Sequence, residues 1–255
     1  MADAAERGAK PRLDQLLVDR GLAESRARAQ ALVIAGKVFS GARRLDKPGT
    51  KLAVDTPLEV RGPDHPWVSR GGVKLAHALD HFAIDPDGLV ALDVGASTGG
   101  FTDVLLARGA AKVYAVDVGR GQLAWKLRQD ARVVVLEGVN ARYLAGADVP
   151  EPIGIIVCDA SFIGLETVLP APLALAGRDA WLVALIKPQF EAGRGKVGKG
   201  GVVRDAEVRR EVCERIRAWL AARPGWRVAG LTESPITGAD GNVEYLIAAR
   251  HGGGG

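Results

Sequence analysis

The chain has 255 residues, of which 47% are hydrophobic and 25% are charged, as is typical of a globular protein with an adequate core. No apolar run reaches the roughly 20 residues that a membrane-spanning helix needs, and residues 1–10 lack the apolar core of a secretory signal, so we expect a cytoplasmic protein that does not bind membranes. The presence of only two cysteines, Cys158 and Cys213, excludes a disulfide framework and a cysteine-rich metal site. The net charge of +4 by itself fits a nucleic-acid partner and a solvated surface equally well.

The positive charge is confined to the first quarter of the chain. Residues 1–62 hold 12 Lys and Arg against 8 Asp and Glu, and the remaining residues hold 22 of each. A basic module joined to a neutral one points to nucleic acid as the partner of the module.

The first part of the chain predicts a small α+β domain over 11–61, after a disordered leader over 1–10. Leucines on one face predict a helix over 12–20, and Ser25 is a favourable N-cap for a second helix over 26–35. Each of these helices is followed by a glycine in the position favoured after a helix C-terminus. Short alternating segments up to Val60 predict strands.

This segment resembles a known RNA-binding module. The stretch RLDQLLVDRGLAESRARAQALVIAGKVFSG is similar to the S4-type domain, in which a helix pair and the adjacent turn grip RNA. The resemblance implies phosphate contacts, which give affinity and positioning but little sequence selectivity. The basic residues that it implicates are Arg12, Arg26, Arg28, Lys37 and Arg43.

Residues 62–69 hold two prolines and Trp67 and predict a short linker. Trp67 can stack on a base or pack at the domain junction, and we favour packing.

From residue 70 to 251, apolar strands alternate with helical stretches, and this pattern predicts an α/β domain with a doubly wound sheet covered on both faces. The connection over 233–242 is too short for a helical crossover, so we expect the last strand to run antiparallel, as in a Rossmann-like methyltransferase sheet. The tail over 252–255 is expected to be disordered. The expected strands are 89–94, 113–116, 133–136, 153–159, 181–187, 226–232 and 243–249, and the expected helices are 71–83, 101–108, 122–128, 163–176 and 206–222.

The first strand of this domain leads into a glycine-rich loop. The stretch LVALDVGASTGGF has the spacing G-x-x-x-G-G, which fits a nicotinamide cofactor less well than another nucleotide-like ligand. About twenty residues on, Asp117 ends the next strand, where a carboxylate can accept hydrogen bonds from both hydroxyls of a ribose. Asp93, the loop and Asp117 together predict an S-adenosylmethionine site, and the alternative is a glycine turn that serves helix packing alone.

Polar residues also end two later strands. Ligands of such sheets bind outside the carboxyl ends of the strands, where Asp159 and Lys187 lie. A lysine at the end of an apolar strand needs a partner, and Asp159 can supply one, although the two could form a purely structural ion pair. With Lys74 and Glu244, two lysines and two carboxylates could converge beside the methyl donor.

The four residues are similar to the Lys-Asp-Lys-Glu tetrad of the FtsJ-like ribose 2'-O-methyltransferases. The matching motifs are SRGGVKL for Lys74, VCDASF for Asp159, LIKPQF for Lys187 and NVEYLI for Glu244. With the basic domain in front, residues 11–250 resemble the TlyA family, also called hemolysin-like, whose members methylate ribosomal RNA.

The resemblance implies S-adenosylmethionine as the cofactor and an RNA contact from Arg70. Asn140 stands where an Asp commonly reads the adenine amino group of the donor, and its amide oxygen can accept the same hydrogen bond. The donor contacts that the resemblance implies are Asp93, Gly95, Ser97, Gly99, Gly100, Phe101, Asp117, Val118, Asn140 and Asp159.

We therefore expect methyl transfer to a ribose 2'-hydroxyl of ribosomal RNA, free or in ribosomal subunits, with the family implying a cytidine of 16S or 23S rRNA or of both. Lys187 is expected to hold and activate the hydroxyl, either as a neutral base or as a cation that stabilises a developing alkoxide. The alternatives are an RNA-binding assembly factor with a non-catalytic donor pocket and a pore-forming hemolysin. No metal is expected, because His77 and His81 lack the glutamate of an HExxH motif.

Overall fold

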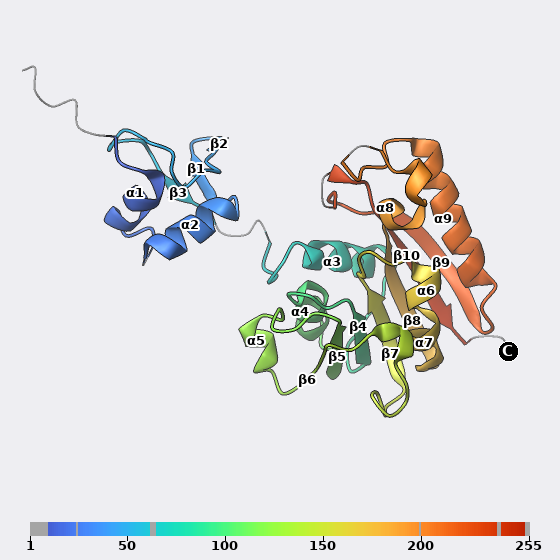
Figure 1. Ribbon diagram of the computed structural model, residues 1–255. Helices are drawn as coiled ribbons and strands as arrows, with labels where there is room; N and C mark the ends of the chain where they lie inside the picture. The colour runs from blue at the N-terminus through green and yellow to red at the C-terminus, as the bar shows by residue number, and fades with distance from the viewer. Residues whose placement is uncertain (1–9, 24, 62–64, 199, 239–240, 253–255) are drawn as a thin grey trace, which may run out of the picture. The chain divides into compact units, whose positions relative to one another are not determined.

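The computed structural model describes five stretches of the chain, residues 10–23, 25–61, 65–198, 200–238 and 241–252. Residues 1–9 of the expected leader, 62–64 of the expected linker and 253–255 of the expected tail lie outside the described residues. The chain divides into two compact units, which we call unit 1 (Met1–Pro66) and unit 2 (Trp67–Gly255) (Figure 1).

Unit 1 packs two helices beside a small antiparallel sheet of order β2-β1-β3. Its core holds leucines of the first helix, among them Leu13 and Leu17, against Val33 and Val38. Ser25 caps the second helix, because its side chain accepts a hydrogen bond from a backbone N–H of the first turn. The α+β prediction is thus confirmed. The elements are α1 (Leu13–Asp19), α2 (Arg26–Ile34), β1 (Val38–Ser40), β2 (Arg43–Arg44) and β3 (Glu59–Val60).

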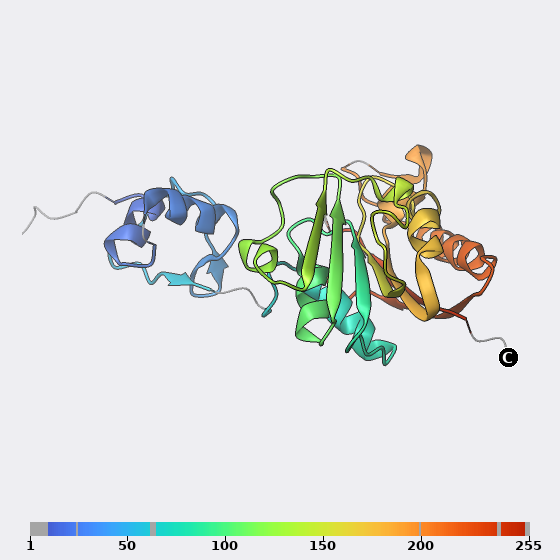
Figure 2. The same cartoon turned by 90° about the horizontal axis from the view of Figure 1, so that it is seen from below.

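Unit 2 is built on a seven-stranded sheet of order β6-β5-β4-β7-β8-β10-β9 (Figure 2). Its strands are β4 (Val90–Val94), β5 (Lys112–Asp117), β6 (Val133–Glu137), β7 (Ile153–Cys158), β8 (Ala176–Ile186), β9 (Trp226–Glu233) and β10 (Tyr245–His251). The neighbouring pairs from β6 to β8 are parallel, and β10 is antiparallel to both β8 and β9. The prediction of an antiparallel last strand is confirmed.

Helices cover both faces of this sheet (Figures 1 and 2). Successive strand residues point to opposite faces, so Leu92 packs into a core with residues of α6, α7 and α9, whereas Ala91 packs into a second core with residues of α3 and α4. The doubly wound α/β prediction is confirmed. The helices are α3 (Gly71–His81), α4 (Gly100–Ala107), α5 (Trp125–Arg128), α6 (Leu165–Val168), α7 (Pro170–Ala174), α8 (Pro188–Glu191) and α9 (Ala206–Ala221), with 3-10 turns η1 (Ala141–Tyr143) and η2 (Arg194–Lys196).

Several predicted elements differ from the structure. The helix expected over 122–128 is only α5 (Trp125–Arg128), and the strand expected over 243–249 runs over Tyr245–His251. The single helix expected over 163–176 is two short helices, because Pro170 begins α7 and cannot supply the N–H that a continuous helix requires there. The strand expected from residue 181 begins at Ala176, where it pairs with Ile153 of β7. The register is irregular between Ile153 and Ile155, opposite residues 176–181 of β8, so the apolar run from residue 181 does not show where this strand begins.

The structure also bears on membrane spans and on the two cysteines. The described residues form no helix that has both the length and the apolar character of a membrane span. Cys158 and Cys213 are buried and unpaired, and burial raises the pKa of each thiol to about 12, as befits small core residues.

Candidate active site

Two adjoining cavities lie at the carboxyl ends of the parallel strands. Cavity A has a volume of about 450 Å³ and extends from the end of β5 to the loop after β7. Cavity B has a volume of about 390 Å³ and extends from the start of α3 to the end of β8. The residues that line both cavities, and so form their shared wall, are Gly95, Ser97, Asp159 and Ser161.

The glycine-rich loop between β4 and α4 runs along this shared wall. Gly95 has φ +82, and a Cβ atom there would come within 3.0 Å of the backbone of Ala160, so the close approach of the two loops requires glycine. Gly99 has φ +96, and a Cβ atom there would lie 2.2 Å from the side chain of Leu127. Gly100 and Phe101 line cavity B, whereas Gly99 packs behind the lining.

Asp117 lies in cavity A with both carboxylate oxygens oriented by the backbone. One oxygen accepts from the N–H of Ser97 at 2.8 Å and the other from the N–H of Gly119 at 2.7 Å. Each oxygen of a carboxylate can accept a second hydrogen bond, so Asp117 can still receive ligand hydroxyls.

The far wall of cavity A carries a polar residue and exposed apolar ones. The side-chain oxygen of Asn140 accepts from the N–H of Arg142 at 3.1 Å, which fixes the amide in the lining. Val118 and Phe162 line the same cavity and are exposed, Phe162 to 89%. The ring of Phe162 lies 4.8 Å from that of Phe190, and its backbone has φ +64. These side chains offer a flat apolar surface to a ligand.

Asp93 lies beneath the glycine-rich loop and lines neither cavity. It is fully buried, and Thr102 donates a hydrogen bond to it at 2.6 Å. Burial raises the pKa of Asp93 to about 7, the hydrogen bond from Thr102 opposes this shift, and the charge of Asp159 adds to it. Asp93 therefore supports the loop from below instead of facing a ligand.

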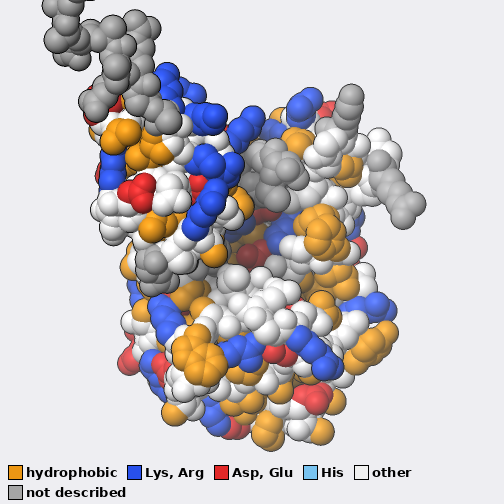
Figure 3. Space-filling view, turned by 60° about the vertical axis from the view of Figure 1, so that its left-hand side comes forward, with side chains coloured by type: hydrophobic (Ala, Val, Ile, Leu, Met, Phe, Trp, Pro, Cys, Tyr) orange, Lys and Arg blue, Asp and Glu red, His pale blue; other side chains and the backbone are white. Residues whose placement is uncertain are grey.

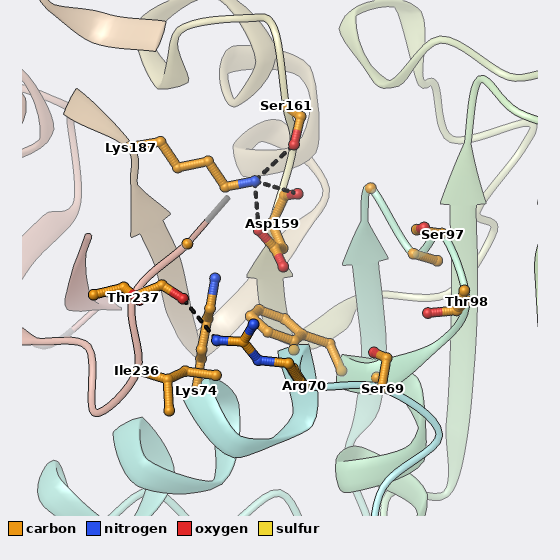
Figure 4. A pocket seen from close by; sticks show the side chains of 16 residues that line it. Ser69, Arg70, Lys74, Ser97, Thr98, Asp159, Ser161, Lys187, Ile236 and Thr237 are labelled. Carbon is orange, nitrogen blue, oxygen red and sulfur yellow. Dashed lines mark hydrogen bonds and ion pairs between the residues drawn. The ribbon is translucent and has the colours of Figure 1, made fainter. Parts of the chain in front are cut away.

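The two lysines and two carboxylates of the predicted tetrad form two ion pairs. Lys187 Nζ lies 2.7 Å from Oδ1 of Asp159, and Lys74 Nζ lies 2.5 Å from Oε2 of Glu244. Both lysines line cavity B, which they enter from α3 and from the end of β8 (Figure 4). The Lys74–Glu244 pair is the more buried, with side-chain exposures of 10% and 2%.

Two residues that sequence reasoning missed hold these pairs. Ser161 Oγ accepts a hydrogen bond from Lys187 at 2.8 Å, and Gln189 donates to the second oxygen of Glu244 at 3.0 Å. Each lies two residues beyond a recognised strand-end residue, Asp159 or Lys187. That proximity was the only signal in the sequence.

Arg70, predicted to contact RNA, lies in the lining of cavity B. Its guanidinium donates to the backbone oxygen of Thr237 at 3.0 Å and so ties the start of α3 to the loop before β10 (Figure 4).

The predicted RNA-binding residues of unit 1 include two arginines that share one carboxylate. Asp14 is fully buried and pairs with Arg12 at 3.0 Å and with Arg26 at 3.1 Å, and Gln30 donates to it at 2.8 Å. The hydrogen bond from Arg12, assisted by those from Gln30 and Arg26, holds the pKa of Asp14 well below its usual range. Lys and Arg side chains stand out on the visible surface of this unit (Figure 3).

Arg28 and Arg43 are exposed, and Lys37 is half-buried. Within the described part of the chain, no cluster of three or more His, Cys, Asp or Glu could hold a metal ion.

Comparison with known proteins places these features in two families. The model of the FtsJ-like methyltransferase family matches residues 67–251, and that of the S4 domain matches residues 11–56. The 16S/23S rRNA (cytidine-2'-O)-methyltransferase TlyA of Mycobacterium tuberculosis is 51% identical over 242 residues, which cover 94% of this chain and 90% of that protein.

Two further relatives carry a different name. Hemolysin A of Brachyspira hyodysenteriae is 41% identical over 236 residues, which cover 92% of this chain and 98% of that protein. A solved structure from Streptococcus thermophilus, also named as a hemolysin, is 43% identical and superimposes with a TM-score of 0.75, covering 96% of this chain and 89% of that one.

Proposed function

The chain belongs to the TlyA family of FtsJ-like methyltransferases with an S4 domain, and from this membership we propose that it transfers a methyl group from S-adenosylmethionine to the 2'-hydroxyl of a cytidine in ribosomal RNA. The observation that carries the proposal is the wall shared by cavities A and B. There the glycine-rich loop meets Asp159, and Asp159 in turn pairs with Lys187 in cavity B.

Cavity A is the proposed donor site, and its lining fits that molecule. Asp117 has acceptor capacity for the ribose hydroxyls, and Asn140 offers an amide oxygen to the adenine amino group. Phe162 supplies an apolar surface for the adenine ring. When bound, the donor supplies a methyl group activated by a sulfonium charge.

Cavity B is the proposed site of the target ribose. A 2'-hydroxyl becomes a good nucleophile only as its proton is drawn away, and it must be held in line with the methyl group. Lys187 orients this hydroxyl and stabilises negative charge that develops on its oxygen, and the hydroxyl proton passes to water as the new O–C bond forms. We favour this cationic role over that of a base, because the carboxylate of Asp159 lies 2.7 Å from the ammonium and supplies its counter-charge.

The second ion pair has a supporting role in this proposal. Glu244 lies outside the lining of cavity B, so it acts through Lys74, whose position it sets together with Gln189. Lys74 adds a second positive charge to the cavity that receives the RNA backbone.

Unit 1 is proposed to bind the RNA through phosphate contacts. Arg70 of unit 2 is proposed to contribute one further contact. The residues of the S4 domain proposed to contact phosphates are Arg12, Arg26, Arg28, Lys37 and Arg43. The name of the Brachyspira relative refers to haemolysis. Methyl transfer accounts for the lysine–carboxylate pairs of cavity B without any haemolytic activity.

The test is incubation with radiolabelled methyl donor and separated ribosomal subunits from a strain that lacks the enzyme, followed by nuclease mapping. We expect label on the ribose 2'-oxygen of a cytidine. Lys187→Ala should lower the rate by at least roughly a hundredfold with donor affinity nearly unchanged, because the lost charge acts on the transition state.

Lys112→Ala is the matched control, because it breaks a lysine–carboxylate pair with Glu151 at the opposite end of the sheet and should methylate normally. Absence of label with donor binding intact would favour the assembly-factor alternative. Failure of Lys187→Ala to fold would indicate a structural ion pair.

A further inference from the structure

We propose that Ser161 is a positioning residue for Lys187: its hydroxyl sets the direction of the Lys187 ammonium in the wall between cavities A and B. The inference rests on the proposed function, because it concerns how Lys187 is presented to the target ribose.

Lys187 makes two kinds of contact, an ion pair with a carboxylate and hydrogen bonds that fix the direction of its ammonium. Its Nζ donates hydrogen bonds to Ser161 Oγ at 2.8 Å and to the backbone oxygen of Asp159 at 3.2 Å (Figure 4). Oδ1 of Asp159 lies 2.7 Å from Nζ as an ion pair, but outside the alignment of a hydrogen bond. An ion pair tolerates many orientations, whereas a hydrogen bond requires alignment. Asp159 therefore supplies the counter-charge, and Ser161 is the side chain that orients the ammonium.

The loop that carries Ser161 is anchored at both ends. At its start, the N–H of Asp159 donates to the backbone oxygen of Val94 at 3.0 Å, which ties the loop to β4. At its end, the side chain of Glu191 accepts from the N–H of Leu165 at 2.7 Å, and this side chain is almost fully buried. A hydroxyl held between two such anchors is suited to fixing another side chain.

The location of Ser161 matches this role. It lines both cavities, whereas Lys187 lines only cavity B. The hydrogen bond from Lys187 to Ser161 therefore directs the ammonium toward the boundary that a transferred methyl group must cross. Without the hydroxyl, the ammonium would keep its counter-ion and its hydrogen bond to the backbone oxygen of Asp159, but it would lose the shorter hydrogen bond that directs it toward this boundary.

The experiment compares three variants in the methyl-transfer assay with ribosomal subunits. Ser161→Ala should lower kcat by roughly ten- to a hundredfold, as expected for one hydrogen bond to a charged group. The donor Kd and the KM for subunits should stay within about twofold. Ser161→Thr keeps the hydroxyl and should restore kcat to within a few-fold of wild type. Thr167→Ala, an exposed hydroxyl outside both cavities, is the control and should behave as wild type.

Three results would overturn the inference: a wild-type kcat for Ser161→Ala, a loss expressed only in donor affinity, or a Ser161→Thr variant as slow as Ser161→Ala. A lowered unfolding temperature that accounts for the lost activity of Ser161→Ala would do the same. If the wild-type protein methylates neither subunit, the proposed function itself fails, and this outcome is distinct from the other four.

Discussion

The Lys74–Glu244 pair stands out among individual residues because both side chains are almost fully removed from water. Burial of two charges costs several kcal/mol each, and their attraction offsets this only with good geometry and further hydrogen bonds. Gln189 supplies one such bond to Glu244. A Cβ atom on Gly238 would lie 2.0 Å from Glu244, so glycine leaves the room that the carboxylate occupies. A buried ion pair of this kind contributes little to the free energy of unfolding, so a role in cavity B explains it better.

Asp93 provides a pH-dependent prediction at the same scale. Burial raises the pKa of Asp93 to about 7, whereas an aspartate of the unfolded chain titrates near ~4. Between these values the folded protein binds more protons than the unfolded chain, so this residue lowers the free energy of unfolding as the pH rises. Asp93→Asn removes the dependence. The free energy of unfolding of the variant, relative to that of wild type, should therefore rise by about 1–3 kcal/mol from pH 5 to pH 8.

The measurement is urea unfolding of the ligand-free protein at both pH values. Asp85→Asn, at an exposed position, is the control and should follow wild type at each pH. An Asp93→Asn variant that differs from wild type by the same amount at pH 5 and pH 8 would contradict the prediction.

At the scale of elements, the start of α3 depends on how residues 67–69 pack against it. The side chain of Trp67 lies so close to Gly72 that a Cβ atom there would come within 2.4 Å of the indole. Trp67 and Val68 also pack against the core that α3 and α4 share, and the N–H of Val68 donates to Asp103 at 2.9 Å. The tryptophan thus packs on α3 within unit 2, whereas the sequence predicts packing at the domain junction.

Gly72→Ala should therefore lower the free energy of unfolding by about 1–3 kcal/mol, because the new methyl group forces Trp67 or the helix to shift. Gly71→Ala is a matched control one residue earlier, where a Cβ atom would meet its neighbours at 3.5 Å or more. Its stability should stay at or slightly above that of wild type, since alanine favours the helix. Chemical denaturation followed by circular dichroism measures both, and equal stability of the two variants would show that this segment does not pack tightly on α3.

At the scale of the whole molecule, the uneven charge sets how the protein meets RNA. The net charge of +4 comes entirely from residues 1–62, and phosphate binding by such a surface releases counterions and weakens with salt. Arg12 and Arg26 are partly neutralised by the buried carboxylate of Asp14. Arg28 is exposed, and only its backbone N–H takes part in the helix cap, so it can be changed without disturbing the fold.

Arg28→Glu should weaken binding to ribosomal RNA and make the plot of log K against log salt concentration shallower by about 1–2 units. Arg227→Glu makes the same change of charge on the exposed edge strand β9 of unit 2 and is the control. Filter binding over a range of salt concentrations distinguishes the two. Equal slopes for Arg28→Glu and wild type would exclude this arginine from the RNA contact.

Much of the fold followed from local patterns in the sequence. Alternating apolar runs and helical stretches predicted the order of the elements and a sheet covered on both faces, because these periods are properties of short segments. The short connection before β10 also predicted its antiparallel direction. Pro170 divides the helix expected over 163–176 and is visible in the sequence, but proline is tolerated in the first turn of a helix, so its presence alone does not say where one helix ends and the next begins.

The positions of the polar residues at the strand ends were likewise local information, whereas their partners were not. Lys74 and Glu244 are 170 residues apart and meet only because the strand order places β10 beside β8 and α3 packs near β10. Tertiary structure alone decided that Asp93 lies beneath the loop and that Ser161 holds Lys187. Sequence periodicity thus determined which elements form and where each polar side chain lies along them, while strand order and burial, which depend on contacts distant in sequence, decided which of these side chains meet.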